Sequence, residues 1–367
     1  MYDVLTNTVF RVGSRAYSWI DILLFAWLQP DWGVFEDAMA FGVSAYKHAE
    51  KHNLLPETHL VEAGLNEFRY QHNLLAAEEV EDWLIQRSLT LSDLIDFITF
   101  SVLRQHFKDQ KLKLLKEYSV SDHELRDMLL SEGYCSGYFN RAAKELSEML
   151  ALYDLAVEKY GVTDHLLYPD QERVDAVEHG VINLLKRYAL EWHNSLPLRE
   201  AIRQYLSFEN MYPLYSEMSS IQTQINLLIR SNQIEWTKVD YDVLEFKDDQ
   251  VAREAALCAR EGTFSIIELA EENIADLSSY SHMIKDLQPE LNDVLSVPLV
   301  TAREGEIIGP LEINGRYVLI RLKNKELPDL DNRSIRELAL KTAVRNMAVI
   351  ESTRRVNWLA NWLAGPQ

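Results

Sequence analysis

The chain has 367 residues, of which 47% are hydrophobic, and its formal net charge is −20 at pH 7. The length allows two or three domains, and the composition, with only 13 glycines and 10 prolines, is that of a folded protein and excludes a disordered one. The negative charge argues against nucleic acid as a partner and favours a neutral or basic one.

The apolar run WIDILLFAWL, residues 19–28, is too short to span a membrane and contains Asp21. We expect a buried helix here, and a signal peptide is the lesser alternative. No other stretch approaches the length of a membrane span. Cys135 and Cys258 stand alone in the sequence, which argues against a disulfide framework or a cysteine zinc site and predicts a cytoplasmic protein.

The first third of the chain begins with a predicted strand at 9–12, a turn at Gly13 and Ser14, and a helix that starts with a capping box formed by Ser18 and Asp21. Apolar residues then recur at spacings of three and four, which predicts amphipathic helices. Their expected starts are Pro56, the segment 76–79, and Thr90 or Ser92. A second helical block is predicted from about 121 to 230, with loops at 159–171 and 231–236.

The pattern changes after Trp236. Strands are predicted at 239–246, 309–313 and 317–322, and the last two form a hairpin because they are joined by Asn314 and Gly315. Between them we expect helices at 248–262 and 265–273, followed by loop and short helices. The tail 331–363 predicts one or two basic helices that pack back onto the body.

The sequence therefore predicts an α+β protein that is mainly α. The expected domains are a helical domain at 1–118, a second helical domain at 119–231, a small α+β domain at 232–328 and a C-terminal helix at 329–367.

The segment GEIIGPLEINGRYVLIRLKNKE, residues 305–326, resembles the closing part of parvulin-type peptidyl-prolyl isomerases, in which Gly305, Glu306 and Pro310 match a conserved run of the family's motif. EGTFSIIELAEE, residues 261–272, is similar to another segment of that family. The opening stretch VFRVGSRAYSWIDIL also resembles the start of the related SurA-like and PpiC-like chaperones. The resemblance implies a helical chaperone module, a parvulin-like domain and a C-terminal helix that returns to the first module.

The resemblance also implies the positions of site residues. The family places one histidine on the first strand of the module and one on the last, where this chain has Asp242 and Tyr317. Leu287, Leu291 and Leu299 are the implied residues of a proline-binding pocket. Because both histidines and a glycine-rich segment are missing, we expect little or no isomerase activity. The alternative is an active isomerase that uses Asp242 and Tyr317.

Two other groups of residues have alternative interpretations. Tyr205, Phe208 and Tyr212 recur at helical spacing, which is typical of a core stripe but also suits a cradle for a client peptide. His48 and His52 have metal-ligand spacing without a third ligand nearby, so we interpret them as surface histidines. Nucleotide-binding and hydrolase motifs are missing, and neither a cofactor nor a metal is expected.

The predicted function is that of a chaperone or maturation factor that binds a peptide or an unfolded protein, with a neutral or basic client and no nucleic acid or membrane partner. The alternatives are an active peptidyl-prolyl isomerase and a scaffold in a biosynthetic or assembly complex. The sequence does not indicate an oligomeric state.

Overall fold

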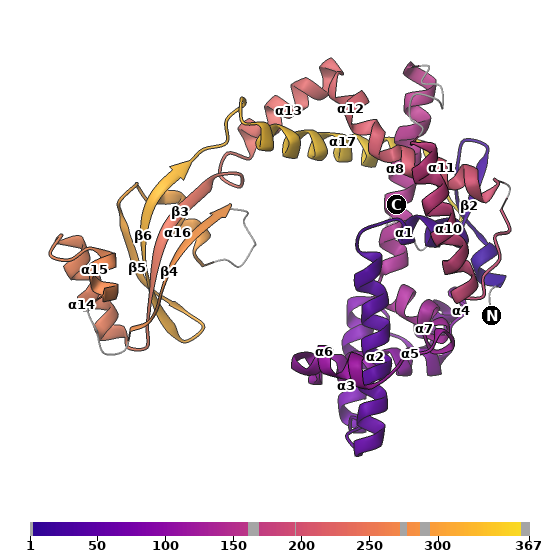
Figure 1. Ribbon diagram of the computed structural model, residues 1–367, viewed down its shortest axis with the longest axis horizontal. Coiled ribbons are helices and arrows are strands. Elements are labelled where there is room, and N and C mark those ends of the chain that lie inside the picture. Colours follow the sequence, from indigo (N-terminus) through magenta and orange to yellow (C-terminus); the bar gives the residue numbers. More distant parts are fainter. Residues whose placement is uncertain (1–2, 161–168, 195, 272–276, 287–293, 361–367) are drawn as a thin grey trace. The chain divides into compact units, whose positions relative to one another are not determined.

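The computed structural model describes residues 3–160, 169–194, 196–271, 277–286 and 294–360 (Figure 1). The chain forms two compact units. The first unit comprises Met1–Pro213 with Arg345–Gln367, and the second unit comprises Leu214–Val344. Helices dominate and the strands form two small antiparallel sheets, so the predicted α+β class, mainly α, is confirmed. The finer division into four domains stays a prediction.

The first unit begins with a short 3-10 helix (Asp3–Thr6), which is followed by a hairpin of β1 (Thr8–Val12) and β2 (Arg15–Ser18) that turns at Gly13 with a φ of 57°. Helix α1 (Trp19–Trp27) follows, and its start has the predicted capping box of Ser18 and Asp21. Strand β2 was not predicted, because its four residues have no clear alternation of polar and apolar side chains.

The rest of this unit is helical. The predicted helix start at Thr90 is confirmed, because its hydroxyl accepts a hydrogen bond from the Asp93 amide at 3.2 Å. The helices after α1 are α2 (Trp32–His52), α3 (Thr58–Gln71), α4 (Ala77–Ile85), α5 (Leu91–His106), α6 (Lys111–Glu117), α7 (Asp122–Cys135), α8 (Tyr138–Tyr160), α10 (Gln171–Arg187), α11 (Leu198–Ser207) and α12 (Met211–Ser216).

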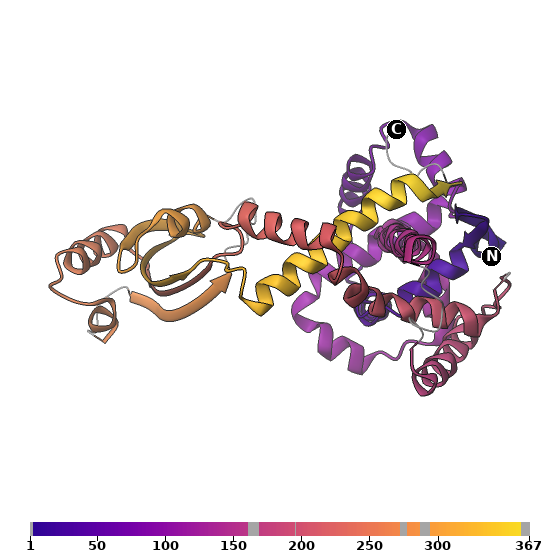
Figure 2. The same cartoon turned by 90° about the horizontal axis from the view of Figure 1, so that it is seen from above.

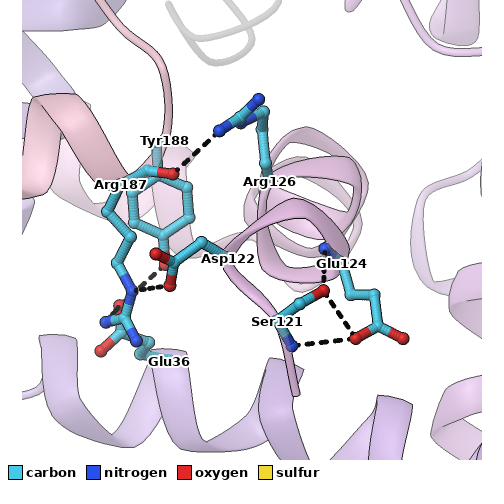
Figure 3. A network of polar contacts seen from close by, with 7 residues as sticks. All are labelled: Glu36, Ser121, Asp122, Glu124, Arg126, Arg187 and Tyr188. Atoms are coloured by element: carbon cyan, nitrogen blue, oxygen red, sulfur yellow. Dashed lines mark hydrogen bonds and ion pairs between the residues drawn. The ribbon is translucent and has the colours of Figure 1, made fainter.

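A polar network joins α2, α7 and α10 (Figure 3). The Arg187 guanidinium lies 2.9 Å from a Glu36 carboxylate oxygen and 2.8 Å from Asp122. Tyr188 donates its hydroxyl hydrogen to the same Glu36 oxygen at 2.8 Å, and Arg126 donates to the Arg187 carbonyl at 3.3 Å. The ion pairs of Arg187 and the hydrogen bonds of Tyr188 and Arg126 therefore connect these three helices.

The tail of the chain returns to the first unit, as predicted. Helix α17 (Arg333–Arg355) is continuous (Figure 2), and Arg355 near its end pairs with Asp154 at 2.6 Å and Glu158 at 2.7 Å on α8. The helix predicted through 363 is wrong beyond Arg355, because the chain continues as strand β7 (Val356–Trp358), which pairs with β1 and completes a sheet of order β2-β1-β7.

The second unit contains a four-stranded antiparallel sheet of order β4-β3-β6-β5. The predicted hairpin at Asn314 and Gly315 is confirmed, since both residues have positive φ angles, of 50° and 75°. The elements of this unit are α13 (Ser219–Ser231), β3 (Lys238–Phe246), α14 (Asp249–Arg260), α15 (Ile266–Glu271), β4 (Leu277–Asp286), α16 (Ser296–Thr301), β5 (Ile307–Ile313) and β6 (Arg316–Glu326).

Strand β4 corrects the prediction of loop and short helices in this part of the chain. Its register with β3 runs from Lys238 opposite Asp286 to Phe246 opposite Leu277. The sequence of β4 contains three serines and no continuous apolar stripe, so the strand depends on this pairing and its own pattern does not reveal it.

The two faces of the sheet have separate cores. On one face Tyr241 and Val243 pack with Leu299 of α16. On the other face Leu244 and Phe246 pack with residues of α14 and α15. Among the described residues no helix is both long and apolar enough to cross a membrane.

Candidate functional site

Asp242 on β3 is the most unusual of the predicted site residues, because its side chain is 0% exposed. Its Oδ1 accepts a hydrogen bond from the Tyr280 hydroxyl at 3.2 Å and lies 3.1 Å from His282 Nδ1. Lys323 Nζ is 3.3 Å from the same oxygen. In the part of the chain that the structure describes, Oδ2 is buried and has no hydrogen-bond partner.

The groups around Asp242 come from three neighbouring strands. Tyr280 and His282 lie on β4, Lys323 lies on β6, and Asp240 on β3 is 3.4 Å from His282 Nδ1. Partial burial, and then the Asp242 carboxylate, raises the pKa of Tyr280. Tyr280, His282 and Lys323 are each about 40% exposed, so the buried carboxylate is surrounded by side chains that reach solvent.

The sheet does not bring Asp242 and Tyr317 together. Asp242 is opposite Arg321 on β6, whereas Tyr317 is opposite Phe246. The two positions are four residues apart along β3, or about 13 Å. Tyr317 packs instead against the core below α14 and α15.

The predicted pocket leucines fall in two classes. Leu287 and Leu291 lie outside the described residues. Leu299 is 1% exposed and belongs to the core between α16 and the sheet. Its role in substrate binding stays a prediction.

The aromatic stripe lies in the first unit, where core packing accounts for two of its members. Tyr205 and Phe208 are 4% and 5% exposed. The Tyr205 hydroxyl donates to Asp21 Oδ1 at 3.0 Å and its ring lies edge-on to Phe25. Tyr212 on α12 is half-buried. The structure thus packs Tyr205 and Phe208 inside the unit, with little surface left for a client.

His48 and His52 are neighbours on α2, with ring centroids 4.6 Å apart. His48 Nδ1 lies 3.1 Å from the Tyr118 hydroxyl, and burial lowers the pKa of His48. Across the described ranges, no group of three or more His, Cys, Asp or Glu side chains is arranged to hold a metal ion.

An apolar groove that the sequence did not predict lies in the first unit, between α3, α4 and the start of α5. Its volume is about 520 Å³. Arg69 is one of its lining residues, and its guanidinium donates to the carbonyls of Leu74 and Leu75 at 3.1 and 2.5 Å. The remaining lining is mainly apolar and includes Leu65, Val80, Leu84, Ile85, Leu89 and Leu91.

Large apolar side chains are exposed in this groove and in the adjoining sequence. Ile85 and Leu91 in its lining are 65% and 54% exposed, and Leu60 and Leu75 nearby in the chain are 44% and 62% exposed. Apolar surface gathered in this way commonly marks an interaction site. The sequence predicts these helices as amphipathic, and only the packing shows which of their apolar residues stay exposed.

The groove is set in an acidic part of the chain. Residues 57–106, which form α3, α4 and α5 with their connections, contain nine acidic and three basic residues. These are Glu57, Glu62, Glu67, Glu78, Glu79, Glu81, Asp82, Asp93 and Asp96 against Arg69, Arg87 and Arg104. An apolar groove with this charge is electrostatically matched to an apolar segment that carries lysine or arginine.

No protein-family model and no curated protein matches the chain. Among solved structures, PrsA from Bacillus subtilis is 14% identical and covers 62% of this chain and 88% of its own length, with a TM-score of 0.22. The peptidylprolyl isomerase PrsA from Bacillus anthracis is 15% identical and covers 57% of this chain and 93% of its own, with a TM-score of 0.24. These TM-scores are too low to establish a shared fold over the aligned length, and the likeness gives no support to a particular activity.

Proposed function

We propose that this protein binds apolar, basic segments of a peptide or unfolded protein in the groove between α3, α4 and α5, and acts as a chaperone or maturation factor. The observation that carries the proposal is the exposed apolar lining of that groove, with Ile85 and Leu91 more than half exposed. Apolar grooves of this kind take up the apolar face of a peptide.

The acidic surroundings of the groove support the choice of a basic client. Residues 57–106 contain six more acidic than basic residues. Such a surface attracts lysine and arginine and repels acidic segments, and the attraction weakens as salt screens it. Cys135 and Cys258 are both free, in keeping with a cytoplasmic location as part of the proposal.

Isomerase activity is not part of the proposal. Asp242 is enclosed by Tyr280, His282 and Lys323, and Tyr317 lies elsewhere on the sheet. A proline-peptide isomerisation assay with the full chain should therefore show no acceleration. Acceleration that is lost in Asp242→Ala or Tyr317→Phe would support the alternative of an active isomerase.

The binding test uses a fluorescein-labelled helical peptide of leucine and lysine and follows its anisotropy on addition of the full chain. The double variant Ile85→Gln with Leu91→Gln should weaken binding at least tenfold, because burying each apolar side chain contributes roughly 1.5 kcal/mol or more and 1.4 kcal/mol is a factor of ten. Both positions are exposed, so the variant should fold.

The matched control is Leu112→Gln with Val34→Gln, two residues that are 75% and 70% exposed and that do not line the groove. This control should bind like the wild type. A leucine and glutamate peptide should bind weakly, and added salt should weaken binding of the basic peptide. Equal losses in the groove and control variants, or equal binding of the acidic peptide, would refute the proposal.

A further inference from the structure

We propose that the outer edge of β4 is a second binding site, which takes up an extended polypeptide segment as an added β-strand. This inference goes beyond the apolar groove, since the site lies in the second unit and recognises main chain in place of a helical side-chain face. The sheet order β4-β3-β6-β5 leaves β4 at one edge (Figure 1). Among the described residues, β4 pairs with β3 on one side and with no strand on the other.

Strand β5 forms the opposite edge of the same sheet, and that edge is protected against pairing with another strand. The contrast between the two edges supports a binding role for β4. Strand β5 contains Pro310, which has no N–H to donate, and its register is irregular between Ile308 and Leu311. Arg260 of α14 also donates to the carbonyls of Ile307 and Gly309, at 3.4 and 2.5 Å. Proline, irregular register and covering groups are the ways in which proteins protect an exposed edge.

Strand β4 is less protected along its ten described residues, although its sequence includes Lys285, a residue type that protects strand edges. Its sequence, LSSYSHMIKD, contains no proline. Tyr280 and Met283 are each 42% exposed and Ile284 is 59% exposed. Its register with β3 is regular except at the Leu277 end, so the strand presents an extended row of backbone N–H and C=O groups.

The Asp242 cluster holds this edge in place. Asp242 on β3 accepts a hydrogen bond from Tyr280 and lies within 3.1 Å of His282, so two side chains of β4 are tied to the neighbouring strand. A strand that is already fixed in the extended conformation loses less conformational entropy when a partner pairs with it. Asp242 is thus a positioning residue for the edge.

The exposed side chains and the charge of the chain define the occupant. An added strand would place its side chains beside Tyr280 and Ile284, where aromatic and β-branched residues pair best. A second copy of the chain would bring another formal charge of −20, which opposes association. The occupant is therefore an extended, neutral or basic segment of another polypeptide that is rich in β-branched or aromatic residues.

The experiment measures the anisotropy of a fluorescein-labelled peptide with the sequence Lys-Val-Thr-Val-Thr-Val-Lys on addition of the full chain. The unmodified peptide should bind and should slow hydrogen exchange of the β4 amides. The same peptide with N-methyl groups on all of its backbone amides keeps its side chains but can donate hydrogen bonds from neither edge, and it should bind at least tenfold more weakly. This comparison needs no protein variant.

Protein variants then locate the site. Ile284→Lys should weaken binding at least tenfold, because it removes an exposed apolar side chain that the added strand would contact and adds a second charge that repels the basic peptide. Leu257→Lys on α14, which changes a side chain that is 56% exposed, should bind like the wild type. The double variant of Ile85 and Leu91 should also retain binding, so that failure at the edge and failure at the groove can be told apart.

Three results would overturn this proposal. The first is equal binding of the N-methylated peptide, and the second is an equal loss in Leu257→Lys and Ile284→Lys. The third is a dimer of the full chain in sedimentation experiments that Ile284→Lys dissociates, because the occupant would then be a second copy.

Discussion

Among the described residues, each of the two units buries one aspartate completely, and the two side chains have different hydrogen-bond partners. Asp21 and Asp242 are both 0% exposed. Asp21 Oδ2 accepts from the Ser18 amide at 2.8 Å, the Ser18 hydroxyl at 2.9 Å and the Asn194 side chain, while Oδ1 accepts from Tyr205 at 3.0 Å. In Asp242, by contrast, the described partners Tyr280, His282 and Lys323 all lie beside Oδ1.

This difference separates a structural carboxylate from one placed near an exposed surface. Both oxygens of Asp21 accept hydrogen bonds from residues in three parts of the first unit. Asp21 is therefore a structural joint, by which we mean a residue that connects these parts. A buried oxygen that has no hydrogen-bond partner among the described residues, as in Asp242, is unusual in a folded protein and calls for an explanation. Asp242 lies on β3, next to the edge strand β4, and we propose that it is placed there to hold Tyr280 and His282 of that strand.

The strongest test of the comparison is Asp21→Ala. This change removes the capping box of α1 and leaves Asn194 and Tyr205 without their carboxylate acceptor. We expect a loss of roughly 3 to 5 kcal/mol in the unfolding free energy of the first unit, measured by urea unfolding. Asp127→Ala, which removes an exposed carboxylate paired with exposed His123, should change it by less than about 0.5 kcal/mol. Similar losses in both variants would contradict the assignment of Asp21 as a joint.

A smaller effect distinguishes the tyrosines that bind the two aspartates. Tyr205→Phe removes the described donor to Asp21 Oδ1 in a buried site and should cost about 1 to 3 kcal/mol. Tyr280→Phe removes one of three groups around Asp242 Oδ1 at a partly exposed position and should cost less than about 1 kcal/mol. Both losses can be measured by urea unfolding, and the reverse order would break the comparison.

Asp242→Asn should have a comparably modest effect, of about 1 to 2 kcal/mol. The asparagine amide keeps an oxygen that can accept from Tyr280, but it loses the negative charge that faces Lys323. Its nitrogen takes the position of Oδ2, which has no described hydrogen-bond partner. Hydrogen exchange of the β4 and β3 amides, with Asp240→Asn as the matched control, would locate the loss. A loss as large as that of Asp21→Ala would show that Asp242 is also a structural joint.

The pH dependence of Asp21 should give the smallest signal. Burial raises the pKa of this carboxyl above the unfolded value of about 3.9. The associated stability is present below the unfolded pKa and is lost as the pH rises through the folded pKa. The stability difference between the wild type and Asp21→Asn should therefore be largest at about pH 4 and fall toward neutral pH. Urea unfolding across this range, with Asp127→Asn as the control, checks the sign, and a difference that grows with pH would contradict it.

Local sequence signals predicted the parts of the fold that depend on neighbouring residues. Ser18 with Asp21 indicated the start of α1, and Asn314 with Gly315 indicated the hairpin of β5 and β6. Both signals work because the hydrogen bonds and backbone angles involved lie within a few residues. Strands β4 and β7 were missed because each exists through pairing with a distant segment.

The sites were predictable only in part for the same reason. Asp242 was singled out, but its partners Tyr280, His282 and Lys323 come from other strands that a linear pattern does not align. The groove was missed because Ile85 and Leu91 look like ordinary members of apolar stripes. Which of these side chains remain exposed is decided by helix packing.

The pairing of β7 with β1 has a consequence for the synthesis of the protein on the ribosome. Val12 pairs with Val356, so the first sheet lacks one of its strands until nearly the whole of the chain described here has been translated. At roughly 5 to 20 residues per second, the wait lasts about 17 to 70 s. During that interval one edge of β1 has no partner strand, and Phe10 lacks its contact with Trp358. The nascent first unit can therefore aggregate through this edge.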